Sequence, residues 1–134
     1  MPIMEMQHDI DPKTKIWNEL GNIQDIQIFH NQVLVAVYIR PDMTKGGIAL
    51  PQQYIKEDRN QSKIGLILKM GPDAFVDPSQ KWFNGVNLKI NDWVIFRPSD
   101  GWAITLPGGK EGVLCRCIED IDVRGSVGSP DQVW

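Results

Sequence analysis

The sequence predicts an all-β domain, a small barrel or sandwich, that carries one short helix near its N-terminus. From residue 28 onwards, short segments rich in Val, Ile and aromatic residues alternate with turn residues. No helical periodicity longer than the one before residue 21 occurs in the chain. The 134 residues suffice for one hydrophobic core and are too few for two. We therefore expect a single β domain with closely spaced strands.

The strands are expected where β-branched runs stop at Gly, Pro or Asn-Asp turns. The clearest run is Gln32-Val-Leu-Val-Ala-Val-Tyr38, which ends before a proline. Two later segments flank Pro107-Gly-Gly-Lys110, which is typical of a hairpin turn. The expected strands are residues 32–38, 63–70, 86–90, 93–96, 101–106 and 111–118, with a short last strand at 121–123.

The short helix is expected between residues 11 and 21. Asp11 is placed to cap it, Pro12 suits its first turn, and Gly21 is expected to stop it. A helix of this length is not stable alone in water, so its apolar face must dock on something. That surface is either its own domain or a partner protein. The apolar face consists of Ile16, Trp17 and Leu20.

Charge and hydropathy exclude several classes of protein. The formal net charge is −3, with a sequence pI near 5.3 and no basic run, which argues against a nucleic-acid partner. No apolar run approaches the roughly 20 residues that a membrane-spanning helix needs. The first residues, MPIMEMQHDIDPK, lack a basic region followed by an apolar one. We expect a cytoplasmic protein that contacts neither nucleic acid nor membrane.

No motif in the sequence indicates an enzyme or a cofactor. Lys110 of the Gly-Gly-Lys turn is followed by Glu111, so a phosphate-binding loop is not formed. No serine lies in a G-x-S-x-G elbow, and no glycine-rich turn joins a strand to a helix. The acidic run 119–122 fits a solvated strand end better than paired catalytic carboxylates or a cation site. We expect no catalytic residues and no cofactor.

The two cysteines, Cys115 and Cys117, are expected to be buried in a strand. Their spacing places both on one face of that strand. His8 and His30 are distant in sequence, so a metal site lacks the further ligands that it needs. Two apolar core thiols in a reducing compartment are the favoured interpretation, and no metal is expected.

Two long connections interrupt the strands, at about residues 41–62 and 70–85. Long connections in compact domains are usually functional or disordered. The first contains TKGGIALPQQ, residues 44–53, in which two glycines precede a short apolar patch. Either a turn tucks Ile48 and Leu50 into the core, or a flexible arm offers them to a partner.

Five segments in collinear order resemble the GroES family of co-chaperonins. They are VLVAV at 33–37, GGIALP at 46–51, KIGLILKMG at 63–71, LKINDWVIF at 88–96 and GVLCRCIEDI at 112–121. The resemblance spans about residues 28 to 125. Asn91 stands where the family usually has glycine. The resemblance implies a GroES-like irregular β-barrel with long exposed loops.

The family's function implies roles for particular residues and partners. Its members form heptameric rings that cap a chaperonin, which itself binds ATP, and so assist protein folding. In the family a mobile loop carries an apolar tripeptide that docks on the chaperonin. That role would fall to Ile48, Ala49 and Leu50, flanked by Gly46, Gly47 and Pro51. By this resemblance the tripeptide belongs to an arm rather than to the core.

The second long connection falls where the family has a roof hairpin. Trp82 and Phe83 make this connection unusually aromatic. Their rings are candidates for closing a roof, for contacting a neighbouring subunit, or for filling a local cluster. The last of these is the default expectation.

The chain departs from the family at both ends. We divide it into an N-terminal extension (1–27), the barrel domain (28–125) and a C-terminal tail (126–134). Ile16, Trp17, Leu20 and Trp134 are candidates for docking these extensions on a foreign surface. An alternative function is therefore a barrel recruited as a structural component, such as a capsid-associated or decoration protein of a phage virion. An oxidoreductase with a GroES-like domain is disfavoured, because the chain has no room for a nucleotide-binding domain.

Overall fold

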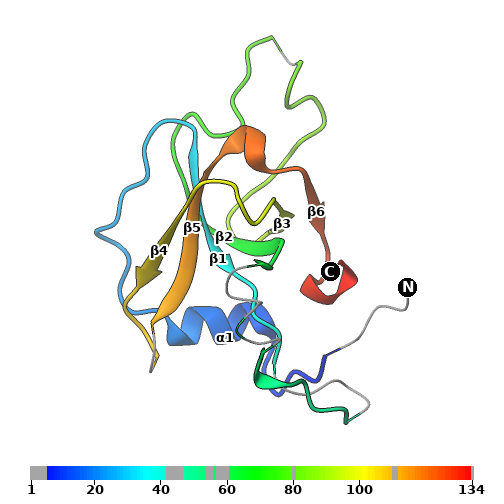
Figure 1. Ribbon diagram of the computed structural model, residues 1–134. Coiled ribbons are helices and arrows are strands. Elements are labelled where there is room, and N and C mark those ends of the chain that lie inside the picture. Colours follow the sequence, from blue (N-terminus) through cyan, green and yellow to red (C-terminus); the bar gives the residue numbers. More distant parts are fainter. Residues whose placement is uncertain are drawn as a thin grey trace.

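The computed structural model describes residues 6–41, 47–53, 56, 61–79, 81–109 and 112–133 (Figure 1). Most of these residues belong to strands and connections, as the sequence predicts for an all-β protein. The elements are α1 (Pro12–Glu19), β1 (Gln32–Val37), β2 (Ile64–Met70), β3 (Trp93–Ile95), β4 (Trp102–Leu106), β5 (Val113–Glu119), η1 (Asp120–Asp122), β6 (Gly125–Val127) and η2 (Pro130–Gln132).

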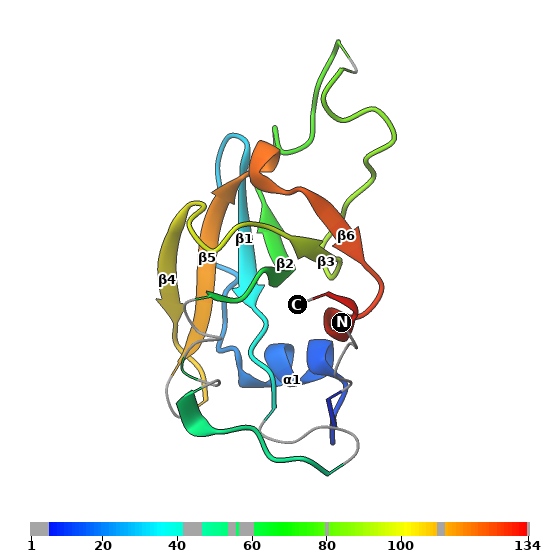
Figure 2. The same ribbon diagram turned by 45° about the vertical axis from the view of Figure 1, so that its right-hand side comes forward.

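The six strands form one antiparallel sheet in the order β4-β5-β1-β2-β3-β6. The sheet curls, so that β4 and β6 stand on opposite sides of the molecule (Figure 2). Strand β1, the first in the chain, lies inside the sheet, where it pairs with both β5 and β2, and β6, the last strand, lies at one edge. The predicted all-β fold is confirmed.

Strand β1 is buried on both faces of the sheet. Successive side chains of a strand point to opposite faces. Leu34 and Ala36 accordingly join one apolar cluster, and Val33 and Val35 join the other. The register with β2 shifts between Leu34 and Val35, where the ladder has a bulge. A continuous apolar run of this kind is typical of a strand that is covered on both sides.

Two of the expected strands are wrong. Residues 86–90 do not join the sheet. The turn that follows them contacts β2 beside the β3 ladder, where Asn91 N–H donates to the Ile67 carbonyl over 2.9 Å. The segment expected as the last strand forms the 3-10 turn η1, in which the Asp122 carboxylate accepts from the Glu119 amide. The last strand is β6, three residues further along. Apolar composition alone therefore misplaced both segments.

Helix α1 begins as predicted but ends by a different device. The Asp11 carboxylate accepts a hydrogen bond from the Thr14 amide over 3.3 Å, and Pro12 occupies the first turn. The helix ends because Leu20 is extended, while Gly21 has no left-handed conformation. Gly21 donates instead to the Pro107 carbonyl over 3.0 Å, and a Cβ there would lie 3.3 Å from the same oxygen.

The apolar face of α1 docks on its own barrel. Ile16, Trp17 and Leu20 pack against the cluster that includes Leu34 and Leu106. The Trp17 indole N–H donates to the Asn91 side-chain carbonyl over 2.5 Å. Of the two surfaces that the sequence left open, the structure therefore shows the protein's own domain.

Asn91, the hydrogen-bond acceptor for Trp17, stands where the family that the sequence resembles usually has glycine. Its φ is 79°, in the left-handed region that usually favours glycine. Asparagine tolerates this conformation better than most residues. Its side chain then supplies an acceptor for Trp17 that a glycine would lack. The substitution thus keeps the turn and holds the N-terminal extension in place.

We expect Trp17→Ala to destabilise the protein by about 2 kcal/mol, because it removes a packed ring and a hydrogen bond to Asn91. Urea unfolding measures the change. Trp82→Ala is the matched control, since the Trp82 side chain is 76% exposed. The control is expected to stay within about 0.5 kcal/mol of the wild type. Equal effects of the two substitutions would contradict the docking of α1.

Candidate functional site

The predicted binding loop has one exposed and one buried apolar side chain. Ile48 is 67% exposed, whereas Leu50 is 9% exposed and belongs to the core. Ala49 lies between them in a β-bridge, and Pro51 is exposed. Gly46 lies outside the described residues. The sequence left two alternatives, an exposed arm and a turn tucked into the core. The segment combines both, because Ile48 is exposed and Leu50 is buried.

Gly47 has a backbone conformation that other residues rarely adopt. Its φ is 88°, in the left-handed region that strains other residues, and a Cβ there would meet no atom within 4 Å. The glycine is therefore required by backbone conformation and not by crowding. The next residue in the chain is the exposed Ile48.

The loop lies at one end of the molecule and the second long connection at the other. Both ribbon views place residues 47–53 at the same end as α1 and the N-terminal segment that starts at residue 6 (Figures 1 and 2). The connection after β2, drawn in green, projects from the opposite end. A partner that engages one end therefore leaves the other free.

The connection after β2 is held together by its own side chains. Phe83 packs edge-on against Phe75, with ring centroids 5.5 Å apart. The Phe75 amide in turn donates to the Asp120 carboxylate over 3.1 Å. Phe83 thus forms the local cluster that was its default expectation. Trp82, its neighbour, contributes an exposed side chain.

Asp77 organises the tip of that connection. Its carboxylate accepts from the Ser79 hydroxyl over 2.6 Å and from the amides of Ser79, Lys81 and Trp82 over 2.8–3.0 Å. These bonds, the one from the Ser79 hydroxyl first, hold the pKa of Asp77 below its usual value. The ionised carboxylate therefore fixes the backbone that presents Trp82.

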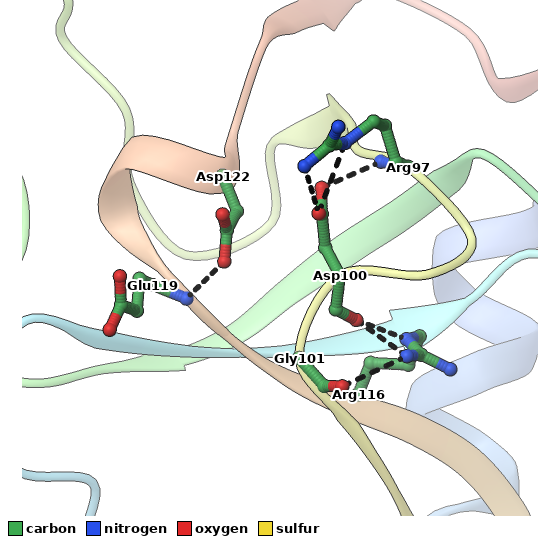
Figure 3. Close-up of polar contacts among 6 residues, drawn as sticks. All are labelled: Arg97, Asp100, Gly101, Arg116, Glu119 and Asp122. Atoms are coloured by element: carbon green, nitrogen blue, oxygen red, sulfur yellow. Dashed lines mark hydrogen bonds and ion pairs between the residues drawn. The ribbon is translucent and has the colours of Figure 1, made fainter.

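Polar contacts join the start of β4 to β5 (Figure 3). The Arg116 guanidinium donates to the Asp100 carbonyl over 2.9 Å and to the Gly101 carbonyl over 3.2 Å. Arg97 donates through its side chain and its amide to the buried Asp100 carboxylate, over 3.0–3.1 Å. Burial alone would raise the pKa of Asp100, but the bonds and charge of Arg97 outweigh it and lower that pKa. These charged residues therefore hold the turn before β4 against β5.

The acidic run 119–122 also acts within the fold. Asp120 accepts from the Asn31 side chain over 3.2 Å as well as from Phe75. Glu119 and Asp122 form a capping box at the start of the turn η1, and Figure 3 shows the bond from the Glu119 amide to the Asp122 carboxylate. Within the described parts of the chain, no three His, Cys, Asp or Glu side chains gather as a metal site.

Both cysteines are buried and free, as predicted. Burial raises the pKa of the Cys115 thiol to about 12 and also raises that of Cys117. A thiol whose pKa is raised on folding stays protonated in the folded protein up to that raised pKa. As the pH rises from about 9 to 12, the unfolded chain releases the proton of Cys115 more readily than the folded protein does, so the folded state loses stability over this range. Neither thiol is a nucleophile near neutral pH.

We expect iodoacetamide at pH 8 to alkylate Cys115 and Cys117 only after unfolding. The thiolate is the reactive form, and burial disfavours it at both positions. Mass spectrometry with and without denaturant counts the modified cysteines. Rapid alkylation of the native protein would show that the strand β5 opens.

The N- and C-terminal segments meet beside the end of β1, a contact that no sequence pattern predicts. Asp131 of η2 accepts from the Tyr38 hydroxyl over 2.6 Å and contacts His8 Nε2 at 2.8 Å. The Met6 amide reaches the same carboxylate over 3.4 Å. Met6, His8 and Tyr38 are each more than 90 positions from Asp131 in the chain, so no local spacing could have revealed their contacts with it. Trp134, the candidate docking residue of the tail, lies outside the described residues.

The fold and the site define a small β protein with an exposed isoleucine in a loop at one end. Residues 25–121, well over half of the chain, match the family described as the chaperonin 10 Kd subunit. The chain therefore belongs to this family, the GroES family of co-chaperonins, and has a co-chaperonin role. Members of this family are not enzymes. No individual curated protein matches the chain.

The match confirms the family that the five sequence segments indicated. It begins after α1 and ends within η1, so α1, β6 and η2 lie outside it. No helix in the described ranges is long and apolar enough to cross a membrane.

Proposed function

We propose that the protein assembles as a heptameric ring and caps a chaperonin through residues 46–51, thereby helping to enclose folding proteins. ATP is bound by the chaperonin and not by this chain. The observation that carries the proposal is Ile48, an isoleucine that is 67% exposed beside the flexible-backbone residue Gly47 in a chain of the chaperonin 10 Kd family. An exposed isoleucine has no benefit for a free monomer and gains free energy when a partner buries it.

The energetics of one loop explain why a ring is needed. Burial of one such side chain contributes roughly 1.5–3 kcal/mol before ordering costs. Leu50 can contribute as well, but it must first leave its buried position, which offsets part of its gain. One loop therefore binds weakly, while several loops on one ring raise the effective concentration and bind tightly.

The sheet leaves an edge for assembly. Strand β6 pairs with β3 on one side, and no described strand pairs with its other side. An open strand edge is a template for another chain, and a head-to-tail contact closes into a ring. Native mass spectrometry should give seven times the subunit mass of 15.2 kDa. A monomer at micromolar concentration would contradict the ring.

The test of the proposal is co-sedimentation with a double-ring chaperonin from the same source, with and without nucleotide. We expect binding only with nucleotide, because the chaperonin must present its docking surface. The control is the same mixture after the chaperonin has been replaced by an unrelated protein of similar mass. Absence of binding by a well-folded oligomer would overturn the proposal.

The structural-component alternative gains no support from the described residues. Its argument depended on four candidate docking residues, Ile16, Trp17, Leu20 and Trp134, being offered to a foreign surface. Trp134 lies outside the described residues, which leaves the other three. All three instead pack against the protein's own core. We therefore propose the co-chaperonin function alone.

A further inference from the structure

Three residues from distant parts of the chain form one polar cluster. Both oxygens of the Asp131 carboxylate are used: one accepts from the Tyr38 hydroxyl over 2.6 Å, and the other contacts His8 Nε2 at 2.8 Å. The Tyr38 hydroxyl also lies 3.3 Å from His8 Nε2, which closes a triangle. The His8 and Asp131 side chains are only 22% and 13% exposed. Contacts to a carboxylate that is largely removed from water are stronger than exposed ones.

Each member of the cluster is fixed by its own surroundings. Tyr38 is buried and packs edge-on against Trp93, with ring centroids 5.7 Å apart. Asp131 lies in η2, where the Ser129 and Gln132 side chains cap the turn. Buried Met6 brings the segment that carries His8 against the same carboxylate. The cluster is therefore a specific junction of three segments and not a chance surface contact.

The cluster lies at the root of the proposed binding loop. Tyr38 directly follows β1, and its amide donates to the carbonyl of Ile64, the first residue of β2, over 2.9 Å. The chain between these two residues contains Ile48 and Leu50. Any shift of Tyr38 therefore moves the point from which the loop departs and the point to which it returns.

We propose that His8, Tyr38 and Asp131 form a clasp with which the two terminal extensions restrain the loop and keep Leu50 buried. The closed clasp fixes the loop root and favours the conformation in which only Ile48 is exposed. The open clasp releases the root and makes Leu50 available as the second docking side chain. The effect of the clasp on chaperonin binding rests on the proposed function, whereas the restraint of the loop by the clasp does not.

The extensions explain why such a device exists in this chain. Neither His8 nor Asp131 lies within residues 25–121, which match the family. Tyr38 does lie within them, so an element of the barrel is joined to two additions. The two terminal additions thereby restrain a loop that is distant from both of them in the sequence.

Hydrogen exchange measured by mass spectrometry tests the clasp in the full-length protein. The variants are Tyr38→Phe, which keeps the ring and removes the hydroxyl, and Asp131→Asn, which keeps the shape and removes the charge. Asp25→Asn is the matched control, because Asp25 is exposed. We expect amides of residues 47–53 to exchange roughly tenfold faster in both variants and unchanged in the control, with β1, β2 and β5 unaffected.

Two results would overturn the clasp. In the first, residues 128–133 exchange faster while residues 47–53 do not, so that the cluster only anchors the tail. In the second, the central strands exchange faster together with the loop even in Tyr38→Phe, so that the cluster belongs to the general stability of the fold. Selective acceleration of the loop is the only result that supports the proposal.

Chaperonin binding by the same variants separates this inference from the proposed function. We expect faster association of Tyr38→Phe than of the wild type, because Leu50 is already released. If the loop exchanges faster in the variants but the wild type does not bind the chaperonin, the clasp proposal stands and the co-chaperonin mechanism is overturned. Binding by the wild type, with no change of loop exchange in the variants, would support the co-chaperonin mechanism and overturn the clasp.

Discussion

Ile48→Asp is expected to weaken binding to the chaperonin by more than about 100-fold while leaving the fold and the oligomer unchanged. The side chain is exposed, so its replacement costs little in the free protein. In the complex the substitution would bury a charge where an apolar side chain is needed, in every loop of the ring at once. Co-sedimentation in the presence of nucleotide measures the loss, and native mass spectrometry checks the ring.

The control for this variant is Ile121→Asp. Ile121 is 52% exposed, similar to Ile48, and lies in η1 at the other end of the molecule. We expect it to bind like the wild type. Equal loss of binding in both variants would indicate a general effect of added charge. Leu50→Asp is a less informative choice, because a charge at a buried position would also disturb the fold.

Gly71→Ala is expected to destabilise the protein by roughly 3 kcal/mol or more. A Cβ at Gly71 would lie 2.2 Å from the His30 carbonyl oxygen and 2.5 Å from that of Phe29. Both are backbone atoms, so no side-chain rotation relieves the overlap. The Gly71 amide also donates to the Gln32 carbonyl over 2.8 Å, which holds the two segments together. Urea unfolding, or loss of soluble expression, measures the effect.

Gly128→Ala is the matched control for this substitution. Gly128 likewise lacks a left-handed φ, and a Cβ there would meet only the flexible Gln132 side chain at 3.6 Å. We expect a change of less than about 1 kcal/mol. A similar cost at both positions would show that loss of glycine itself, and not the close approach at Gly71, decides the result.

The sequence predicted much of the sheet because local composition and burial agree there. Strand β1 is an apolar run rich in valine. The hairpin of β4 and β5 surrounds a glycine turn whose Gly108 and Gly109 have positive φ. Composition failed at residues 86–90, where Val86 and Ile90 are apolar but exposed and unpaired in the sheet. Apolar content alone does not tell whether a neighbouring strand is present to pair with the backbone.

The candidate loop was found through its resemblance to a family, and the structure added what the resemblance could not. The motif GGIALP gave Ile48 and Leu50 the same role. The described loop instead distinguishes them, since one side chain is exposed and the other is buried. This difference depends on how the loop packs on its own domain, which the order of residues in a short motif does not encode.

By itself the sequence determined the all-β class, the family, the start of α1 and the burial of both cysteines. These depend on near neighbours in the chain: side-chain periodicity, capping residues and apolar runs. Only the tertiary structure decided that Trp17 docks on Asn91 and that Tyr38 meets His8 and Asp131. Such contacts join residues 30 to 93 positions apart, and they form only after the sheet has brought the ends of the chain together.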